Sequence, residues 1–331
     1  MRVLVTGGAG YIGSHTAKAL VGAGFEPVVL DDFSGGHRWA VKWGALVEGN
    51  LGDSAFVRRV ISEYRAVAVI HFAASILVGE SMTNPQKYFW NNVVNTLRLL
   101  DAMLEVGVKH IVFSSSAAVY GNPEKVPIPE DHPERPINAY GETKLSMERA
   151  IKWYGLAYGM RWMALRYFNA AGADPDGELG EEHDPETHLI PLVIKAALGQ
   201  RPPVEVYGTD YPTADGTAVR DYIHIVDLAE AHVRSLRHIL GGGESCPLNL
   251  GTGQGHSVRE VIAAVDRMSN VRVPFRDAPR RAGDPPVLVA DPQRAHQILA
   301  WQPQHSDLDS IVESAWNWHA KNRGQGSGAV G

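Results

Sequence analysis

The chain has 331 residues, of which 44% are hydrophobic and 21% charged, as is usual for a folded globular protein. Its formal net charge of -6 argues against a general nucleic-acid-binding protein, which needs an excess of lysine and arginine. The single cysteine, Cys246, excludes an intrachain disulfide, and no run reaches the roughly 18–20 apolar residues of a membrane span. Because Arg2 to Thr6 run directly into glycines, unlike a signal peptide, we expect a cytoplasmic protein with no nucleic-acid or membrane partner.

The first half of the chain alternates short apolar runs with amphipathic stretches. The runs predict strands near residues 3–5, 27–30, 45–47, 67–71, 110–113 and 162–165. The stretches between them predict helices near residues 11–21, 55–63, 85–106 and 138–158. Continuous apolar strands separated by helices are typical of a parallel sheet covered on both faces. The sequence therefore predicts an α/β fold with a six-stranded, Rossmann-type, doubly wound parallel sheet.

The second half has a different rhythm. A polar, turn-rich stretch from Asp174 to Glu178 predicts a boundary, which places the first domain at residues 1–175. Beyond it we expect helices near 189–198, 226–240 and 258–268 and strands near 204–207 and 248–250. These predict a smaller mixed α/β substrate-binding domain over residues 176–323, with room for some segments to return to the first domain. Residues 324–331 are expected to form a flexible tail.

A glycine cluster directly follows the first predicted strand and precedes a predicted helix. Gly7, Gly10 and Gly13 are spaced by three, and Gly8 gives a second pattern, Gly8-x-Gly10-x-x-Gly13. Glycine permits a tight turn and a close approach of backbone to a pyrophosphate, and the helix N-terminus offers free N–H groups to the phosphates. Glycines also fill ordinary turns, but their position between strand and helix predicts a dinucleotide site.

Asp31 ends the second predicted strand, about twenty residues after the glycines. A carboxylate there accepts hydrogen bonds from the adenosine ribose hydroxyls and repels a 2′-phosphate, which favours NAD over NADP. A solvated acid at a strand end is the alternative interpretation, and Arg38 is the one nearby residue that weakens the exclusion of NADP.

Tyr140 and Lys144 are four residues apart at the start of a predicted helix, so both side chains lie on one face. A nearby ammonium favours the tyrosinate, and we expect it to lower the pKa of Tyr140 towards that of a general base. Ser114, Ser115 and Ser116 follow the fifth predicted strand, at the sheet edge where such folds bind ligands. A hydroxyl there can hold a substrate hydroxyl towards the base, although a serine-rich strand end is the simpler interpretation.

Several longer motifs accompany these residues. They are Thr6-Gly7-Gly8-Ala9-Gly10-Tyr11-Ile12-Gly13-Ser14-His15, His71-Phe72-Ala73-Ala74, Val78-Gly79-Glu80-Ser81, Val119-Tyr120-Gly121, Leu165-Arg166-Tyr167-Phe168-Asn169, Asp210-Tyr211-Pro212-Thr213 and Val219-Arg220-Asp221-Tyr222-Ile223-His224. Together with the Tyr140/Lys144 pair, this set resembles the UDP-sugar 4-epimerases of the extended short-chain dehydrogenase/reductase class. The match spans nearly the whole chain.

The resemblance implies an isomerase that interconverts UDP-galactose and UDP-glucose with a retained NAD. In that mechanism Tyr140 takes the proton from the sugar 4-hydroxyl while hydride passes from C4 to the nicotinamide. Lys144 binds the nicotinamide ribose, and Ser116 bridges Tyr140 and the sugar. The 4-keto sugar then turns over in the pocket, and hydride returns to its other face.

The resemblance also implies the ligand contacts. Residues expected at the cofactor are Gly7, Gly10, Tyr11, Ile12, Gly13, Asp31, Asp32, Phe33, Gly36, Asn50, Leu51, Phe72, Ala73, Ala74, Asn91, Ser114, Tyr140, Lys144 and Phe168. Residues expected at the UDP-sugar are Ser116, Tyr140, Asn169, His188, Leu189, Tyr207, Arg220, Arg281, Asp284 and Leu288. Two guanidinium groups suit a pyrophosphate because each offers several donors in a fixed fork, whereas a structural salt bridge is their alternative role.

Some positions depart from the pattern of that family. Ala118 stands where a threonine is frequent, Ile76 where a lysine is frequent, and Asn50 where an aspartate is usual. Leu288 is intermediate between a bulky tyrosine and the small residues that admit N-acetylated sugars, which leaves UDP-N-acetylglucosamine open as a substrate. The implied homodimer pairs the helices near 85–106 and 138–158.

The residues after Ser116 also bear on other functions of the same scaffold. Ala117 and Ala118 replace the acidic pair of nucleotide-sugar 4,6-dehydratases, which argues against dehydration. An epimerase of UDP-xylose and UDP-arabinose needs the same residues and stays open, and a non-catalytic NAD-binding sensor is disfavoured by the intact Tyr140, Lys144 and Ser116. The 14 histidines are scattered along the chain without ligand spacing, so the sequence predicts no metal site.

Overall fold

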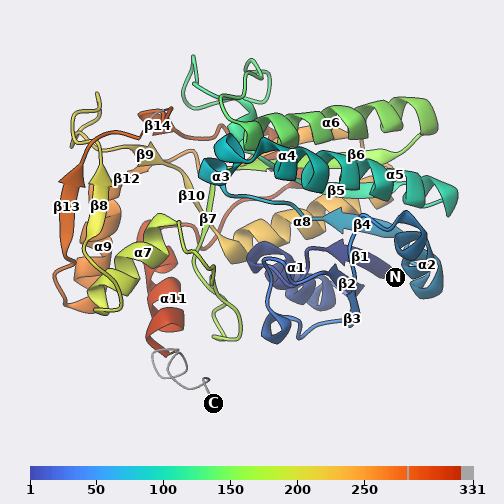
Figure 1. Ribbon diagram of the computed structural model, residues 1–331, viewed down its shortest axis with the longest axis horizontal. Coiled ribbons are helices and arrows are strands. Elements are labelled where there is room, and N and C mark those ends of the chain that lie inside the picture. The colour runs from blue at the N-terminus through green and yellow to red at the C-terminus, as the bar shows by residue number, and fades with distance from the viewer. Residues whose placement is uncertain (282, 322–331) are drawn as a thin grey trace.

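The computed structural model describes residues 1–281 and 283–321. Within them, seven parallel strands form the central sheet in the order β11-β6-β5-β4-β1-β2-β3 (Figure 1). The strands are β1 (Arg2–Thr6), β2 (Glu26–Asp31), β3 (Ala45–Glu48), β4 (Ala68–His71), β5 (His110–Ser116), β6 (Arg161–Tyr167) and β11 (Cys246–Leu250). The six predicted strands and the predicted parallel pairing are confirmed.

The prediction of a six-stranded sheet is wrong by one strand. The strand predicted near 248–250 is β11, which joins the sheet beside β6, with Leu248 opposite Leu165. The chain thus returns to the first sheet well after residue 175, and β11 is one of the later segments for which the predicted boundary left room. Residues 324–331, predicted as a flexible tail, lie outside the described residues.

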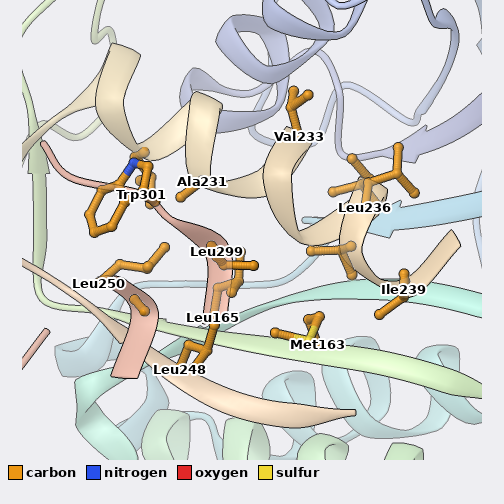
Figure 2. Packing of buried hydrophobic residues seen from close by; sticks show 14 of the residues in the cluster. Met163, Leu165, Ala231, Val233, Leu236, Ile239, Leu248, Leu250, Leu299 and Trp301 are labelled. Carbon is orange, nitrogen blue, oxygen red and sulfur yellow. The ribbon is translucent and has the colours of Figure 1, made fainter. Parts of the chain in front are cut away.

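Helices cover both faces of this sheet. One face carries α1 (Tyr11–Gly22), α8 (Ile225–Leu240) and α10 (Gln293–Leu299), and the other carries α2 (Ser54–Tyr64), α5 (Asn95–Glu105) and α6 (Ala139–Tyr158). Successive strand residues point to opposite faces, so Val3 and Val5 belong to one core and Leu4 to the other. Figure 2 shows the first core, where Leu236 of α8 faces Met163 of β6.

The second part of the molecule lies at the left of Figure 1. Its core is formed by α7 (Leu189–Ala197), α9 (Val258–Ser269) and α11 (Leu308–Lys321), packed with β8 (Val204–Tyr207). The remaining strands are short: β7 (Asn169–Ala171), β9 (Val219–Arg220), β10 (Tyr222–His224), β12 (His256–Ser257), β13 (Phe275–Ala278) and β14 (Val287–Leu288). They pair as β10-β7, β12-β9-β14 and β13-β8.

The helix predicted near 85–106 is three consecutive helical segments. They are α4 (Pro85–Tyr88), a π-helical turn, η2 (Phe89–Val94), and α5. Turns of this type are frequent at functional sites. Three further short helical segments surround the sheet edge: η1 (Arg38–Ala40), α3 (Val78–Thr83) and η3 (Ala117–Val119). Among the described residues, no helix is both long enough and apolar enough to cross a membrane.

Candidate active site

The glycine loop connects β1 to α1 at the point where the strand order reverses, between β1 and β4. Gly7 has a φ of +71°, and a Cβ on it would lie 2.6 Å from the backbone nitrogen of Ala73. A Cβ on Gly13 would lie 2.3 Å from the carbonyl oxygen of Gly7. Gly10 caps α1 without a side chain, and the first turn of α1 holds no acid. The loop is therefore a backbone cradle with free N–H groups, which fits a dinucleotide pyrophosphate.

We expect Gly13→Ala to weaken NAD binding about 10- to 100-fold, measured by titrating nucleotide-stripped protein with NAD. The new methyl group forces the backbone of the loop apart, and overpacking of this kind costs about 1–3 kcal/mol. Gly22→Ala is the matched control, because a Cβ on that residue of the same helix meets nothing within 4 Å. Equal affinities of the two variants for NAD would contradict the assigned role of the loop.

Asp31 lies at the end of β2, against this loop. Its Oδ2 accepts a hydrogen bond from Ala9 N at 2.9 Å and its Oδ1 accepts one from Phe33 N at 2.8 Å. Burial raises the pKa of the Asp31 carboxyl, and the backbone N–H groups oppose that shift. Arg38 pairs with Glu48. The Arg38 guanidinium is thus already paired with a carboxylate, which supports the preference for NAD over NADP.

The residues around Asp31 complete this end of the site. Asn50 Nδ2 donates to Asp32 Oδ2 at 2.6 Å, and Asn50 Oδ1 accepts from Gly52 N at 2.7 Å. Asn50 thus holds this loop in place. The aspartate that is usual at this position in the family would put a second carboxylate beside Asp32. A Cβ on Gly36 would lie 2.8 Å from the carbonyl carbon of Ala9, so the two loops touch through their backbones.

The structure brings the three predicted catalytic residues together at the carboxyl end of β5. Tyr140 and Lys144 lie in the first turns of α6, whose N-cap Asn138 accepts from Gly141 N at 2.8 Å. Ser116, the last residue of β5, is hydrogen-bonded to the Tyr140 side chain. Lys144 Nζ donates to the Ser114 carbonyl at 2.7 Å and lies 5.8 Å from the centre of the Tyr140 ring.

A close approach of backbones fixes this geometry. A Cβ on Gly141 would lie 2.5 Å from the carbonyl oxygen of Ala118, so only glycine lets α6 begin directly against η3. Tyr140 thereby faces the strand end that carries Ser116. The sequence analysis did not assign a role to Gly141, although its position between the tyrosine and the lysine was a visible signal.

The pKa of Tyr140 departs from expectation in direction. Burial raises it to about 12, and only the hydrogen bond with Ser116 lowers it. Burial also lowers the pKa of Lys144 to about 7, which the Glu148 carboxylate opposes. The Lys144 ammonium therefore does not produce the expected lowering of the Tyr140 pKa. Desolvation dominates because both groups are enclosed.

We expect Lys144→Met to flatten the pH dependence of stability in nucleotide-stripped protein. The folded-state pKa lies below the unfolded value, so between about pH 7 and 10.5 the unfolded chain binds the extra proton and stability rises with pH. The slope is at most about 1.4 kcal/mol per pH unit. The variant lacks this slope, so its advantage over the wild type is largest below pH 7. Urea unfolding at pH 6.5 and 9.5 measures it, and an equal difference at both values would refute it.

Buried hydrogen bonds around Ser114 and His71 support the site. The hydroxyls of Ser114 and Tyr167 are hydrogen-bonded to each other. His71 is held between Thr6 Oγ1 at 2.7 Å and Thr96 Oγ1 at 2.9 Å, and burial lowers its pKa to about 3. The imidazole is therefore neutral, and it anchors β4 beside the glycine loop.

The π-helical turn contributes an amide to the same region. Asn92 Oδ1 accepts from Ser75 N at 2.7 Å, and Asn92 Nδ2 donates to Thr143 Oγ1 at 3.0 Å. It thus ties the segment after β4 to α6 between Tyr140 and Lys144. Its predicted neighbour Asn91 donates to Ser75 Oγ at 3.1 Å. No sequence signal distinguished the buried asparagine from the predicted one.

The predicted substrate residues form a second group, on the short strands. Arg220 of β9 pairs with Asp284 and lies opposite Leu288 of β14. The Arg281 guanidinium lies 3.9 Å from the centre of the Tyr207 ring. Asn169 opens β7 and is paired with Tyr222 of β10, whereas His188 caps α7 and Leu189 is its first residue.

A small apolar cluster links the two groups. Phe168 and Leu288 both pack against the buried cluster that includes Val119 and Leu145. Phe168 was predicted at the cofactor and Leu288 at the sugar, so they share one wall behind the Ser116 strand end. The ring of Phe72, also predicted at the cofactor, is tilted against that of His232 of α8, with 4.8 Å between the ring centres.

The histidines are less scattered than the sequence suggested. Glu181, His183, Glu186 and His188 present ligand atoms that all lie within 4.8 Å of one another. These four residues lie close together in the sequence, but their spacing matches no common metal-binding motif.

This edge of the sheet combines a dinucleotide-binding loop, at the point where the strand order reverses, with a buried tyrosine. These features are typical of dinucleotide-dependent enzymes that use a tyrosine for proton transfer. A model described as "NAD dependent epimerase/dehydratase family" matches residues 3–251. The chain belongs to that family.

Named relatives cover nearly the whole chain. A UDP-glucose 4-epimerase of Rhizobium meliloti (strain 1021) is 52% identical over 324 residues, which are 98% of each chain. One from Lacticaseibacillus casei is 48% identical over 329 residues, or 99% of each chain. The crystal structure of UDP-glucose 4-epimerase from Brucella ovis in complex with NAD is similar at a TM-score of 0.94 and 52% identity, over 96% of this chain and 97% of that one.

Proposed function

We propose that the chain is a UDP-glucose 4-epimerase, an isomerase that interconverts UDP-galactose and UDP-glucose with NAD as a retained cofactor. The observation that carries this proposal is the meeting of Ser116, Tyr140 and Lys144 at the carboxyl end of β5 beside the glycine loop, where Lys144 Nζ donates to the Ser114 carbonyl. Ala117 and Ala118 follow Ser116 and supply no acid for dehydration. The relatives with nearly full-length matches carry the same name.

NAD fits the cradle because Gly7, Gly13 and Gly36 let the backbone segments of the loop pack directly on one another, where a Cβ would clash, and Asp31 is held against the loop by Ala9 N. NAD bound there would supply the hydride acceptor and donor for C4 of the sugar. Lys144 Nζ, held by the Ser114 carbonyl, binds the nicotinamide ribose. The helix N-terminus at Tyr11 and Ile12 faces the pyrophosphate.

Tyr140 accepts the proton of the sugar 4-hydroxyl, with Ser116 as the bridge between the two hydroxyls. Burial alone holds the pKa of Tyr140 near 12, so the chain's own residues keep the phenol protonated. A positive charge beside the ring favours the tyrosinate, and the oxidised nicotinamide carries such a charge. Proton acceptance is therefore coupled to a loaded, oxidised site.

The UDP-sugar is held from the second part of the molecule. Arg220 and Arg281 bind the pyrophosphate, and Asp284 positions Arg220 through its ion pair. Leu288 lies on the strand beside Arg220 and packs into the wall shared with Phe168, which limits the space at the sugar. Asn169, His188, Leu189 and Tyr207 complete the proposed contacts.

A homodimer is proposed on the face of α6 and the π-helical turn. Trp153 and Leu156 are each 68% exposed and Trp90 is 56% exposed. Large apolar side chains gathered on neighbouring helices mark an interaction surface. The proposed compartment is the cytoplasm, for which the lone cysteine is suited.

The test is to incubate purified protein with UDP-galactose without added NAD and to measure UDP-glucose through a coupling dehydrogenase. Turnover is expected without NAD because the cofactor is retained. UDP-N-acetylgalactosamine and UDP-arabinose, assayed in parallel, rank the substrates that Leu288 admits. Absence of UDP-galactose turnover even with added NAD would refute the hexose assignment and direct the assay to UDP-xylose and UDP-glucuronate.

A further inference from the structure

Four side chains in the segment that precedes α7 form the Glu–His cluster: Glu181, His183, Glu186 and His188. The Nδ1 atom of His183 lies 3.4 Å from Glu181 Oε1 and 3.6 Å from Glu186 Oε2. The Nδ1 atom of His188 lies 2.9 Å from Glu181 Oε1 and 3.1 Å from Glu186 Oε1. Both imidazoles thus present the same nitrogen to the same two carboxylates.

Hydrogen bonds satisfy this arrangement only in part, through the contact of His188 Nδ1 with Glu186 Oε1 at 3.1 Å. An imidazole Nδ1 carries at most one proton, yet each Nδ1 faces two carboxylate oxygens. The buried atoms His183 Nδ1 and Glu186 Oε2 form no hydrogen bond within the part of the chain that the structure describes. Unsatisfied buried polar atoms are costly, and a missing ion is one of their ordinary explanations.

Glu186 is held in place from one side only. Its Oε1 accepts hydrogen bonds from Thr187 N at 2.8 Å and His188 N at 2.9 Å, and its side chain is only 5% exposed. The backbone donors therefore orient the carboxylate and leave Oε2 directed at His183. Outer-shell hydrogen bonds orient metal-binding carboxylates in this way.

The spacing of the ligand atoms matches a metal polyhedron. Zinc binds histidine nitrogen and carboxylate oxygen at about 2.0–2.2 Å, which gives tetrahedral edges of about 3.4 Å. With Glu186 Oε2 as the second oxygen ligand, three distances between imidazole nitrogens and carboxylate oxygens are 2.9, 3.4 and 3.6 Å. Two neutral imidazoles and two carboxylates also balance a divalent charge.

The other acidic group in this region differs in that its charge is already compensated. Asp174, Asp176 and Glu178 surround Lys18 Nζ at 2.8, 2.6 and 3.0 Å. An ammonium occupies the centre of that group, so it has no place for an ion.

We propose that the Glu–His cluster binds one Zn²⁺ ion through His183 Nδ1, His188 Nδ1 and one oxygen each of Glu181 and Glu186. Imidazole ligands favour zinc over magnesium or calcium, and four protein ligands make a closed, structural site. The proposal is independent of the epimerase reaction. It also leaves His188 Nε2 available for the uridine contact proposed above.

The ion would join the two parts of the molecule. The cluster leads directly into Leu189 of α7, and the His183 ring lies 6.3 Å from the Tyr11 ring at the start of α1. The neighbouring Glu182 carbonyl is hydrogen-bonded to His37 Nε2 at 3.0 Å. Zinc would thus fix the segment that connects the glycine loop to the substrate side.

The test is to strip the full-length protein with a chelator, add zinc alone, remove the excess on a column and measure metal by mass spectrometry. The expected result is about one zinc per chain for the wild type. His183→Gln and Glu186→Gln should each weaken zinc binding by about 100-fold or more, because each removes a ligand from a closed site. Glu182→Gln, in the same segment but with an exposed carboxylate, should bind as the wild type does.

Cobalt substitution gives a second readout that does not depend on how the variants fold. The wild-type protein loaded with Co²⁺ should show the visible absorption of a tetrahedral cobalt centre. A wild-type protein that retains less than about a tenth of an equivalent of zinc, or an octahedral cobalt spectrum, overturns the proposal. So does unchanged affinity in folded Glu186→Gln protein.

Discussion

Replacing Tyr140 with phenylalanine should lower kcat about 10²- to 10⁴-fold, the range that general acid–base catalysis contributes. The phenol, in the first turn of α6, lies against Ser116 at the end of β5. Phenylalanine keeps the ring and its packing but has no hydroxyl. We therefore expect the variant to fold, to retain NAD and to lose turnover of UDP-galactose in the coupled assay.

Tyr154→Phe is the matched control for that experiment. Tyr154 lies on the same helix, and its hydroxyl donates to Asp101 Oδ1 at 2.6 Å, away from Ser116. This variant should keep the wild-type kcat. A Tyr140→Phe protein that retains NAD and whose kcat stays within about threefold of the wild type would rule out Tyr140 as the proton acceptor.

The parallel sheet could be predicted because continuous apolar runs are typical of buried parallel strands. The strand 68–71, for instance, is wholly buried between helices, and its composition shows it. The partner strand of β11 was not predicted, for a physical reason. Its pairing with β6 depends on where α8 returns the chain, and a run such as Leu248–Leu250 carries no information about its partner.

The candidate catalytic residues could be proposed from the sequence because their chemistry is local in sequence. Tyr140 and Lys144 share a helix face, and Ser116 ends a strand. The pKa of Tyr140 was not predictable, because its direction depends on how completely the fold encloses the phenol. The Glu–His cluster escaped for a related reason. Its ligand geometry arises from a loop conformation, and residue spacing alone does not determine that conformation.

Removal of the Arg166 side chain has the largest expected effect on stability. Arg166 is 1% exposed in β6, and its Nε donates to Glu148 Oε1 at 3.0 Å while Nη1 donates to Tyr120 Oη at 3.0 Å. Nη2 reaches carboxylate oxygens of Glu134 and Glu148 at 2.5 Å. Arg166→Ala leaves the buried Glu148 carboxylate without its cation, which costs about 3–5 kcal/mol. Urea unfolding of wild type and variant measures the loss.

Two further variants separate the ion pair from mere loss of side-chain volume. Arg149→Ala removes an exposed guanidinium 3.9 Å from Glu134 and should change the free energy of unfolding by less than about 1 kcal/mol. The double variant Arg166→Met/Glu148→Leu should be more stable than Arg166→Ala, because it leaves no buried carboxylate unpaired. Equal losses in the double variant and in Arg166→Ala would instead assign the cost to packing.

The network lies directly behind the site, since the Ser115 hydroxyl donates to Glu148 and the next residue is Ser116. A stable but inactive double variant would therefore indicate that the buried charges position the strand end at which Tyr140 works.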